Sequence, residues 1–271
     1  PAPGLRAKVA DYQNRPTIFL DERPVSPILY ALTDVPGGRR SWDELPQHNV
    51  AQFCSDGIRL FQVDVFLEQL WSEDGTLSLD YAQRQVAGIQ AVCPEAAVFF
   101  RLHVNAPRWW TARYPEENVR YDSAGYSPDI RDGLSRLVEA DPRNPQRTSL
   151  ASEKWRTEAG EQVARFCRDF AKTPEGRALA GVQVACGVYG EWHQWGFLNW
   201  EADQGEAMVR HFRNWLRAKY TTAESLQQHW NDPAATFETA HVPGIAARRV
   251  QDGGNFRDPQ REQRVIDYYQ C

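Results

Sequence analysis

The segment Ala97-Val-Phe-Phe-Arg-Leu-His-Val104 decides the fold. It is an apolar run of strand length, rich in β-branched and aromatic residues, and it predicts a buried strand of a parallel sheet. Segments of the same kind stand on both sides of it, and they predict the other strands of the sheet: Pro27–Leu32, Ile58–Phe66 and Gly181–Val188.

Helical patterns separate these strands. A capping box, Ser41-x-x-Glu44, predicts a helix that Gly57 ends, and apolar residues at helical spacing predict helices over 80–93 and 149–171. Strand and helix therefore alternate four times, which predicts an α/β fold of βα units around a parallel sheet. Four units are half of a (β/α)8 TIM barrel, and long loops use the remaining length.

The rest of the chain flanks these four units. Residues 1–26 are expected to hold an N-terminal β-hairpin over Pro16–Pro24, and residues 27–199 the first four βα units. Residues 200–271 read as an extended insertion after strand four and the start of the next helix. A doubly wound nucleotide-binding sheet is the alternative, but neither GxGxxG nor GxxxxGK[ST] is present.

Composition narrows the class of protein. With 42% hydrophobic and 25% charged residues the chain is expected to be soluble and globular, and its net charge of -5 disfavours nucleic acid as a partner. No apolar run has the length of a membrane span. A secreted or periplasmic location is expected if a signal peptide has been removed, and a homo-oligomer is left open. The cysteines are odd in number, widely spaced and without a CxxC, which predicts free thiols: Cys54, Cys93, Cys167, Cys186 and Cys271.

Polar and aromatic side chains gather where the predicted strands end. Working residues of βα barrels lie at the carboxyl ends of strands. Sugars need flat rings to stack on and polar groups around their edges. We therefore expect a carbohydrate site, without metal or cofactor, lined by Asp64, Arg101, His103, Asn105, Trp109, Trp110, Tyr189, Trp192, His193 and Trp195.

Glu191 is the candidate catalytic residue. It follows the fourth strand between aromatic neighbours, and partial desolvation there would raise its pKa and suit it to general acid catalysis. The alternative is a structural carboxylate paired with an arginine such as Arg101. The sequence has neither a GxSxG elbow nor an HExxH motif. For His103 and His193, hydrogen bonding is favoured over a shared metal.

Several motifs resemble glycoside hydrolase family 42 and its relatives in clan A. The similarity covers nearly the whole chain and rests on the order and spacing of the runs Phe100–Trp110, Tyr114–Glu116, Gly187–Trp192, Phe212–Tyr220, Ser225-Leu226 and His229–Asn231. The resemblance implies a bacterial-type TIM-barrel enzyme that hydrolyses β-glycosides, often β-galactosides, with retention. It also implies that Glu191 is the acid/base at the end of strand four.

One position departs from the family pattern. The family usually has Asn before the acid/base glutamate, where this chain has Gly190. The family's nucleophile lies on strand seven, and no residue of this chain can be assigned to it. The first hypothesis is thus a retaining β-glycosidase, β-galactosidase-like, seen as its N-terminal part. The second is a non-catalytic carbohydrate-binding relative of the same fold, which Gly190 favours.

Overall fold

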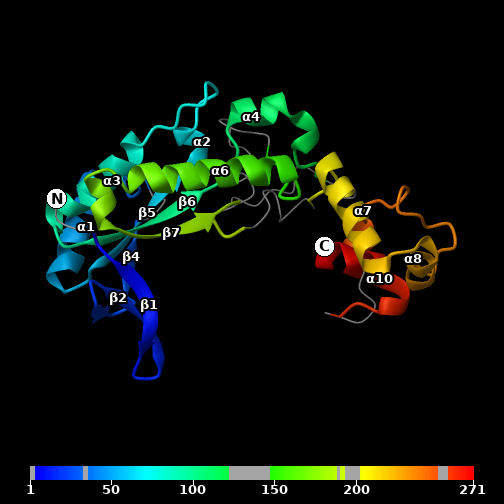
Figure 1. Cartoon of the computed structure of the whole chain (residues 1–271), viewed down its shortest axis with the longest axis horizontal. Helices are drawn as coiled ribbons and strands as arrows, with labels where there is room; N and C mark the ends of the chain where they lie inside the picture. The colour runs from blue at the N-terminus through cyan, green and yellow to red at the C-terminus, as the bar shows by residue number, and fades with distance from the viewer. Residues whose placement is uncertain (1–3, 33–35, 122–146, 188–189, 193–201, 250–255) are drawn as a thin grey trace. The chain divides into compact units, whose positions relative to one another are not determined.

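A four-stranded parallel sheet, in the order β4-β5-β6-β7, organises the first part of the chain (Figure 1). Its strands are β4 (Leu29–Ala31), β5 (Leu60–Phe66), β6 (Ala97–His103) and β7 (Leu179–Ala185). Strands that follow one another in sequence are neighbours in space, as in consecutive βα units of a barrel. The predicted mixed α/β class with a parallel sheet is confirmed.

The computed structural model describes residues 4–32, 36–121, 147–187, 190–192, 202–249 and 256–271. The chain divides into two compact units. Unit 1 comprises Pro1–Pro107 and Ala159–Trp192, and unit 2 comprises Arg108–Glu158 and His193–Cys271. In the parts of the chain just given, no helix has both the length and the apolar character of a membrane span.

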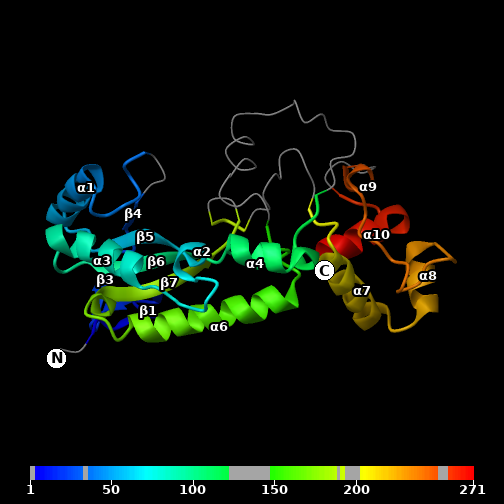
Figure 2. The same ribbon diagram turned by 90° about the horizontal axis from the view of Figure 1, so that it is seen from above.

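One face of the parallel sheet is apolar and covered by helices. Alternate residues of β5 and β6, such as Val63 and Phe100, are fully buried on it. Phe100 packs against Phe166 and Phe170 of α6 (Glu153–Phe170), with ring centroids 5.8 and 4.9 Å apart. Helix α3 (Asp80–Val92) packs on β5. These contacts hold α6 alongside β6 and β7 (Figures 1 and 2).

The opposite, inner face changes from apolar to polar along the strands. At the start of the strands, Leu60 and Ala97 pack with Leu20 of an N-terminal sheet. That sheet consists of β1 (Ala7–Tyr12), β2 (Arg15–Leu20) and β3 (Arg23–Val25), paired antiparallel. The predicted hairpin is confirmed as β2 and β3, while β1 was missed. Both turns are tight, with positive φ at Gln13, Asn14, Asp21 and Glu22.

The predicted capping box is wrong. Helix α1 (Glu44–Ser55) begins after Asp43, and Ser41 does not cap it. Ser41 is instead fully buried, and its N–H donates to the side-chain oxygen of Gln85 in α3 over 2.8 Å. A Cβ on Gly88 would lie 2.2 Å from Ser41 Oγ, so glycine is required there for the loop before α1 to dock on α3.

The remaining elements of unit 1 are short: α2 (Leu67–Leu70) and η2 (Glu175–Ala178). Unit 2 holds α4 (Arg108–Arg113), η1 (Pro115–Glu117), α7 (Glu206–Tyr220), α8 (Ala223–Trp230), α9 (Ile245–Arg249) and α10 (Pro259–Gln270). Its core includes Phe212, Leu216 and Leu226, all fully buried. The predicted helices after the fourth strand are confirmed as α7, α8 and α10.

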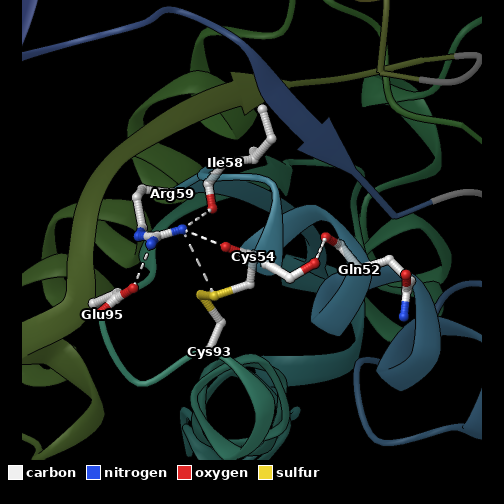
Figure 3. Close-up of a disulfide and its surroundings, with 7 residues drawn as sticks. Gln52, Cys54, Ile58, Arg59, Cys93 and Glu95 are labelled. Atoms are coloured by element: carbon white, nitrogen blue, oxygen red, sulfur yellow. Dashed lines mark hydrogen bonds and ion pairs between the residues drawn. A yellow bond between two sulfur atoms is a disulfide. The ribbon is translucent and has the colours of Figure 1, made fainter.

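A disulfide joins Cys54 to Cys93, so the prediction that these cysteines are free was wrong (Figure 3). Cys54 lies at the end of α1 and Cys93 directly follows α3, and their Cα atoms are 5.9 Å apart. The wide spacing of these cysteines in the sequence argues against a pair. However, α1 and α3 belong to successive βα units of the parallel sheet, and their C-terminal ends lie side by side. Arg59 donates to the Cys54 carbonyl at 2.7 Å and pairs with Glu95 at 2.5 Å beside the bridge.

Removal of this disulfide is expected to destabilise unit 1. The bridge closes a loop of 39 residues, and a cross-link of this kind contributes about 2–4 kcal/mol to the free energy of unfolding. The double variant Cys54→Ser/Cys93→Ser should show this loss in urea unfolding, whereas Cys271→Ser, which removes a free thiol, should change little. Thiol titration of the unreduced, denatured protein should count three thiols, and a count of five would contradict the bridge.

Candidate active site

The carboxylate of Asp64 forms the centre of a buried polar cluster on the inner face of the sheet. Asp64 on β5 and Arg101 on β6 are paired in register, so both side chains lie on this face. Arg101 donates through Nε to Oδ1 at 2.6 Å and through Nη2 to Oδ2 at 2.9 Å. His103 Nε2 donates to Oδ1 at 3.2 Å. The predicted neighbourhood of Asp64, Arg101 and His103 is thus present.

The electrostatics of this cluster assign Asp64 a structural part in the site. Burial by itself raises the pKa of Asp64, but the hydrogen bonds of His103 and Arg101 and the Arg101 charge lower that pKa to about 2. The carboxylate is therefore ionised at neutral pH. It cannot donate a proton to a leaving group, and its oxygens are engaged by the cluster. Its role is to orient Arg101 and His103.

An aromatic pair supports the imidazole of His103. Phe66 lies two residues after Asp64 on β5, on the same face of the sheet and in register with His103. Its ring stacks on His103 with centroids 4.5 Å apart and an interplanar angle of 16°. The guanidinium of Arg39, from the segment between β4 and α1, lies 5.1 Å from the Phe66 ring. The stack fixes the plane of the imidazole while Asp64 fixes its direction.

Gln183 also belongs to the inner face. It is in register with Arg101, and it accepts a hydrogen bond from Gln62 Nε2 at 2.8 Å. Neither Phe66 nor Gln183 is among the site residues predicted from the sequence. The two-residue period of the strands, carried outward from Asp64 and Arg101, is the signal that would have found them.

The segment after β7 turns sharply and carries Glu191 to the surface. Positive φ angles at Gly187, Gly190 and Trp192 bend the backbone, and the Trp192 N–H donates to the Cys186 carbonyl at 2.8 Å. Glu191 is exposed in the described part of the chain, contrary to the predicted partial burial. The Trp192 side chain, next to Glu191, is likewise 50% exposed.

Asn105 holds the start of this turn. Its Oδ1 accepts from the Gly187 N–H at 3.2 Å and from Cys186 Sγ at 3.4 Å, which ties the end of β6 to the end of β7. Asn105 is partly exposed, with its amide nitrogen outside these two contacts. The prediction that Asn105 and Glu191 share one edge of the sheet is consistent with these bonds.

Gly190 is packed directly against the polar cluster. A Cβ at this position would lie 3.0 Å from His103 Cε1 and 3.0 Å from Ala185 Cβ, at a φ of +78°. An asparagine at position 190 would therefore require this turn and the imidazole to move apart. The departure from the family pattern is built into the local backbone.

The two tryptophans after β6 belong to unit 2 and have different surroundings. Trp110 is fully buried, donates from Nε1 to Glu158 at 2.7 Å and packs edge-on against Trp155. It is a core residue, so the prediction that its ring serves as a sugar platform is corrected. Trp109 is partly exposed, with the Arg113 guanidinium 5.2 Å from its ring.

Three predicted site residues lie outside the described residues: Tyr189, His193 and Trp195. Within the ranges that the structure does describe, there is no group of three or more His, Cys, Asp or Glu side chains arranged to hold a metal ion.

The fold is shared with solved carbohydrate enzymes. A β-galactosidase from the Antarctic haloarchaeon Halorubrum lacusprofundi is 16% identical at a TM-score of 0.54, over 90% of this chain and 31% of that one. The catalytic domain of a β-amylase from Paenibacillus polymyxa is 12% identical at a TM-score of 0.60, over 89% of this chain and 59% of that one. A β-galactosidase from the psychrophilic Marinomonas ef1 is 17% identical at a TM-score of 0.50, over 80% of this chain and 30% of that one.

These likenesses show a glycoside hydrolase-like fold. The chain spans about 30% of the length of the β-galactosidases that it resembles. The sequence matches no family model and no curated protein.

Substitution of Asp64 should change how stability depends on pH. Asp64→Asn leaves Arg101 without its counter-charge and removes the carboxylate that accepts from His103, and it should cost about 3 kcal/mol at pH 7. The wild-type carboxylate has a pKa lowered from 3.8 to about 2, so its stabilisation is complete above pH 4 and is lost as pH falls towards 2, by about 2 kcal/mol. Urea unfolding should show the gap between the two proteins narrowing over this range. A gap independent of pH would contradict the assignment.

Gly190→Ala should destabilise the protein by about 2–4 kcal/mol, because a positive φ and a close contact with His103 act together. Gly75→Ala is the matched control: its φ is +85° but a Cβ there meets nothing within 4 Å, so it should cost only about 1–2 kcal/mol. Thermal unfolding measures both, and equal losses would remove the contact with His103 from the explanation.

Proposed function

We propose that this chain supplies the N-terminal half of a (β/α)8 barrel in a retaining, β-galactosidase-like glycoside hydrolase, with Glu191 as the general acid/base. One observation carries the proposal: Glu191 follows β7 at the edge of the sheet where Asp64, Arg101 and His103 form a buried polar cluster. Active sites of βα barrels occupy this edge. The glycoside hydrolase-like fold supports the same assignment.

The exposure of Glu191 bears on its role. A general acid must reach the glycosidic oxygen, and an exposed carboxyl at the rim can do so. In the proposed enzyme a bound sugar would cover this carboxyl and exclude water from it. Glu191 would then protonate the leaving oxygen and later activate water.

The nucleophile is a separate matter. A retaining mechanism needs a second carboxyl about 5–5.5 Å from the first. Asp64 is poorly suited, because Arg101 and His103 hold its oxygens and keep it on the inner face of the sheet. We propose that a carboxylate on the opposite side of the complete barrel attacks the sugar.

The remaining groups of this edge fit sugar recognition. Arg101 and His103 are oriented donors, Asn105 offers an amide, and the half-exposed ring of Trp192 offers a flat apolar surface. Pyranoses combine apolar faces with a polar edge, so this combination of planar and polar groups suits them.

A non-catalytic carbohydrate-binding relative is the second candidate, and Gly190 favours it. The small, tightly packed residue before Glu191 leaves out the side chain that the resembling enzymes usually carry there. A protein that kept the polar rim without this group could bind a sugar without hydrolysing it.

Glu191→Gln in the full-length protein distinguishes the two candidates. If Glu191 is the acid/base, turnover of β-galactosides with poor leaving groups should fall by about 10²–10⁴-fold, and activated aryl glycosides should lose less in glycosylation. Glu161→Gln, an exposed glutamate on α6, should leave turnover unchanged. Near-wild-type turnover by Glu191→Gln would remove Glu191 from the role. Sugar binding without any turnover by the wild type would favour the non-catalytic relative.

A further inference from the structure

Unit 2 contains a cavity of its own, which shares no residue with the strand-end site. Its volume is about 330 Å³, at the lower end of the range for sites that hold small molecules. Glu117 of η1, the beginning of α6 and one side of α7 line it. Ala151 and Ala207 form part of the wall, and their short side chains leave the space open.

Glu117 is buried at the wall of this cavity, with 8% of its surface exposed. Its Oε1 accepts a hydrogen bond from Arg210 Nη2 at 2.6 Å. Its Oε2 is buried and has no hydrogen-bond partner among the residues that the structure describes. A buried carboxylate oxygen without a donor is costly. A hydroxyl that enters the cavity can supply that donor once the Arg210 side chain, 52% exposed, shifts while it keeps its bond to Oε1.

The charged groups around the cavity already have counter-charges, including Glu153, which lies 4.0 Å from Arg156. Arg210 pairs with Glu117, and Lys154 pairs with Glu158 at 2.7 Å while its ammonium lies 4.2 Å from the Tyr114 ring centroid. Both cations thus have their counter-charges inside unit 2. A charged ligand would have to break one of these pairs or stay unpaired, so a neutral ligand is favoured.

Donors stand on α7, across from Glu117. His211 is half-buried, and its ring has no hydrogen-bond partner within the described ranges. Asn214, one turn further, accepts from Arg217 at its Oδ1, which leaves the amide N–H groups. An acceptor on one wall and donors on the other match a ligand whose groups both donate and accept, as hydroxyls do.

We propose that this cavity is a second binding site, for a neutral hexose ring. Glu117 accepts from one hydroxyl, and His211 and Asn214 donate to others. The alanine wall leaves room for the ring. The proposal does not rest on the glycosidase assignment, because it uses only residues of unit 2.

The test follows the imidazole of His211 by NMR while galactose is added to the full-length protein. Galactose should shift the His211 resonances in a saturable way. Ala151→Leu, which fills the cavity without changing charge, and Glu117→Gln should each weaken this response by about tenfold or more. Trp192→Ala, which alters only the strand-end rim, should leave the His211 response unchanged.

Three results would overturn the proposal. His211 could stay unmoved by galactose at any concentration, or sulfate could shift it where galactose does not, which would make the cavity an anion site. The response could also disappear in Trp192→Ala and persist in Ala151→Leu, which would locate the sugar at the strand ends. Glycosidase activity plays no part in this readout, so the failure of either proposal is distinguishable from that of the other.

Discussion

A carboxylate buried to 3% exposure, that of Asp64, is tolerated only because Arg101 and His103 meet it from the next strand. An isolated charge in this position would cost far more than a folded domain can lose. The pairing in turn depends on the register of β5 and β6, since a slip of one residue would move Arg101 to the helix-covered face. The register of β5 and β6 therefore determines both the charge pairing in the site and the orientation of His103.

The turn after β7 is adapted to the same cluster. Gly190 comes within contact distance of His103, so the imidazole that Asp64 orients also limits what can precede Glu191. Asn105 ties the beginning of this turn to the end of β6. The proposed acid/base thus sits on a segment whose shape is set by residues of two strands. A change in the polar cluster would therefore alter the position of Glu191 even though Glu191 itself is unchanged.

Two buried carboxylates of unit 2, those of Asp267 and Glu117, differ in the hydrogen-bond donors that their oxygens receive. Asp267, fully buried, accepts from Lys219, Gln263, Tyr220 and Trp230 at 2.7–2.8 Å, and it joins α7, α8 and α10 around one charge. Burial and the neighbouring Asp267 raise the pKa of Tyr220, which keeps its hydroxyl a donor. Among the described residues, Glu117 has a donor for only one of its two oxygens, and it lines a cavity. Both oxygens of Asp267 receive hydrogen bonds from within unit 2. The unsatisfied oxygen of Glu117, by contrast, supports the proposal that a ligand binds there.

The sequence by itself determined the succession of strands and helices, because apolar runs and helical periods are local properties. It also placed Asp64, Arg101 and His103 at strand ends, since parallel strands bring their carboxyl ends to one edge. Only the tertiary structure decided which of these groups touch. Trp110 entered the core, Cys54 met Cys93, Ser41 left the helix cap for Gln85, and Glu191 reached the surface. Each of these outcomes depends on contacts between segments far apart in the chain, and side-chain burial is a property of such contacts.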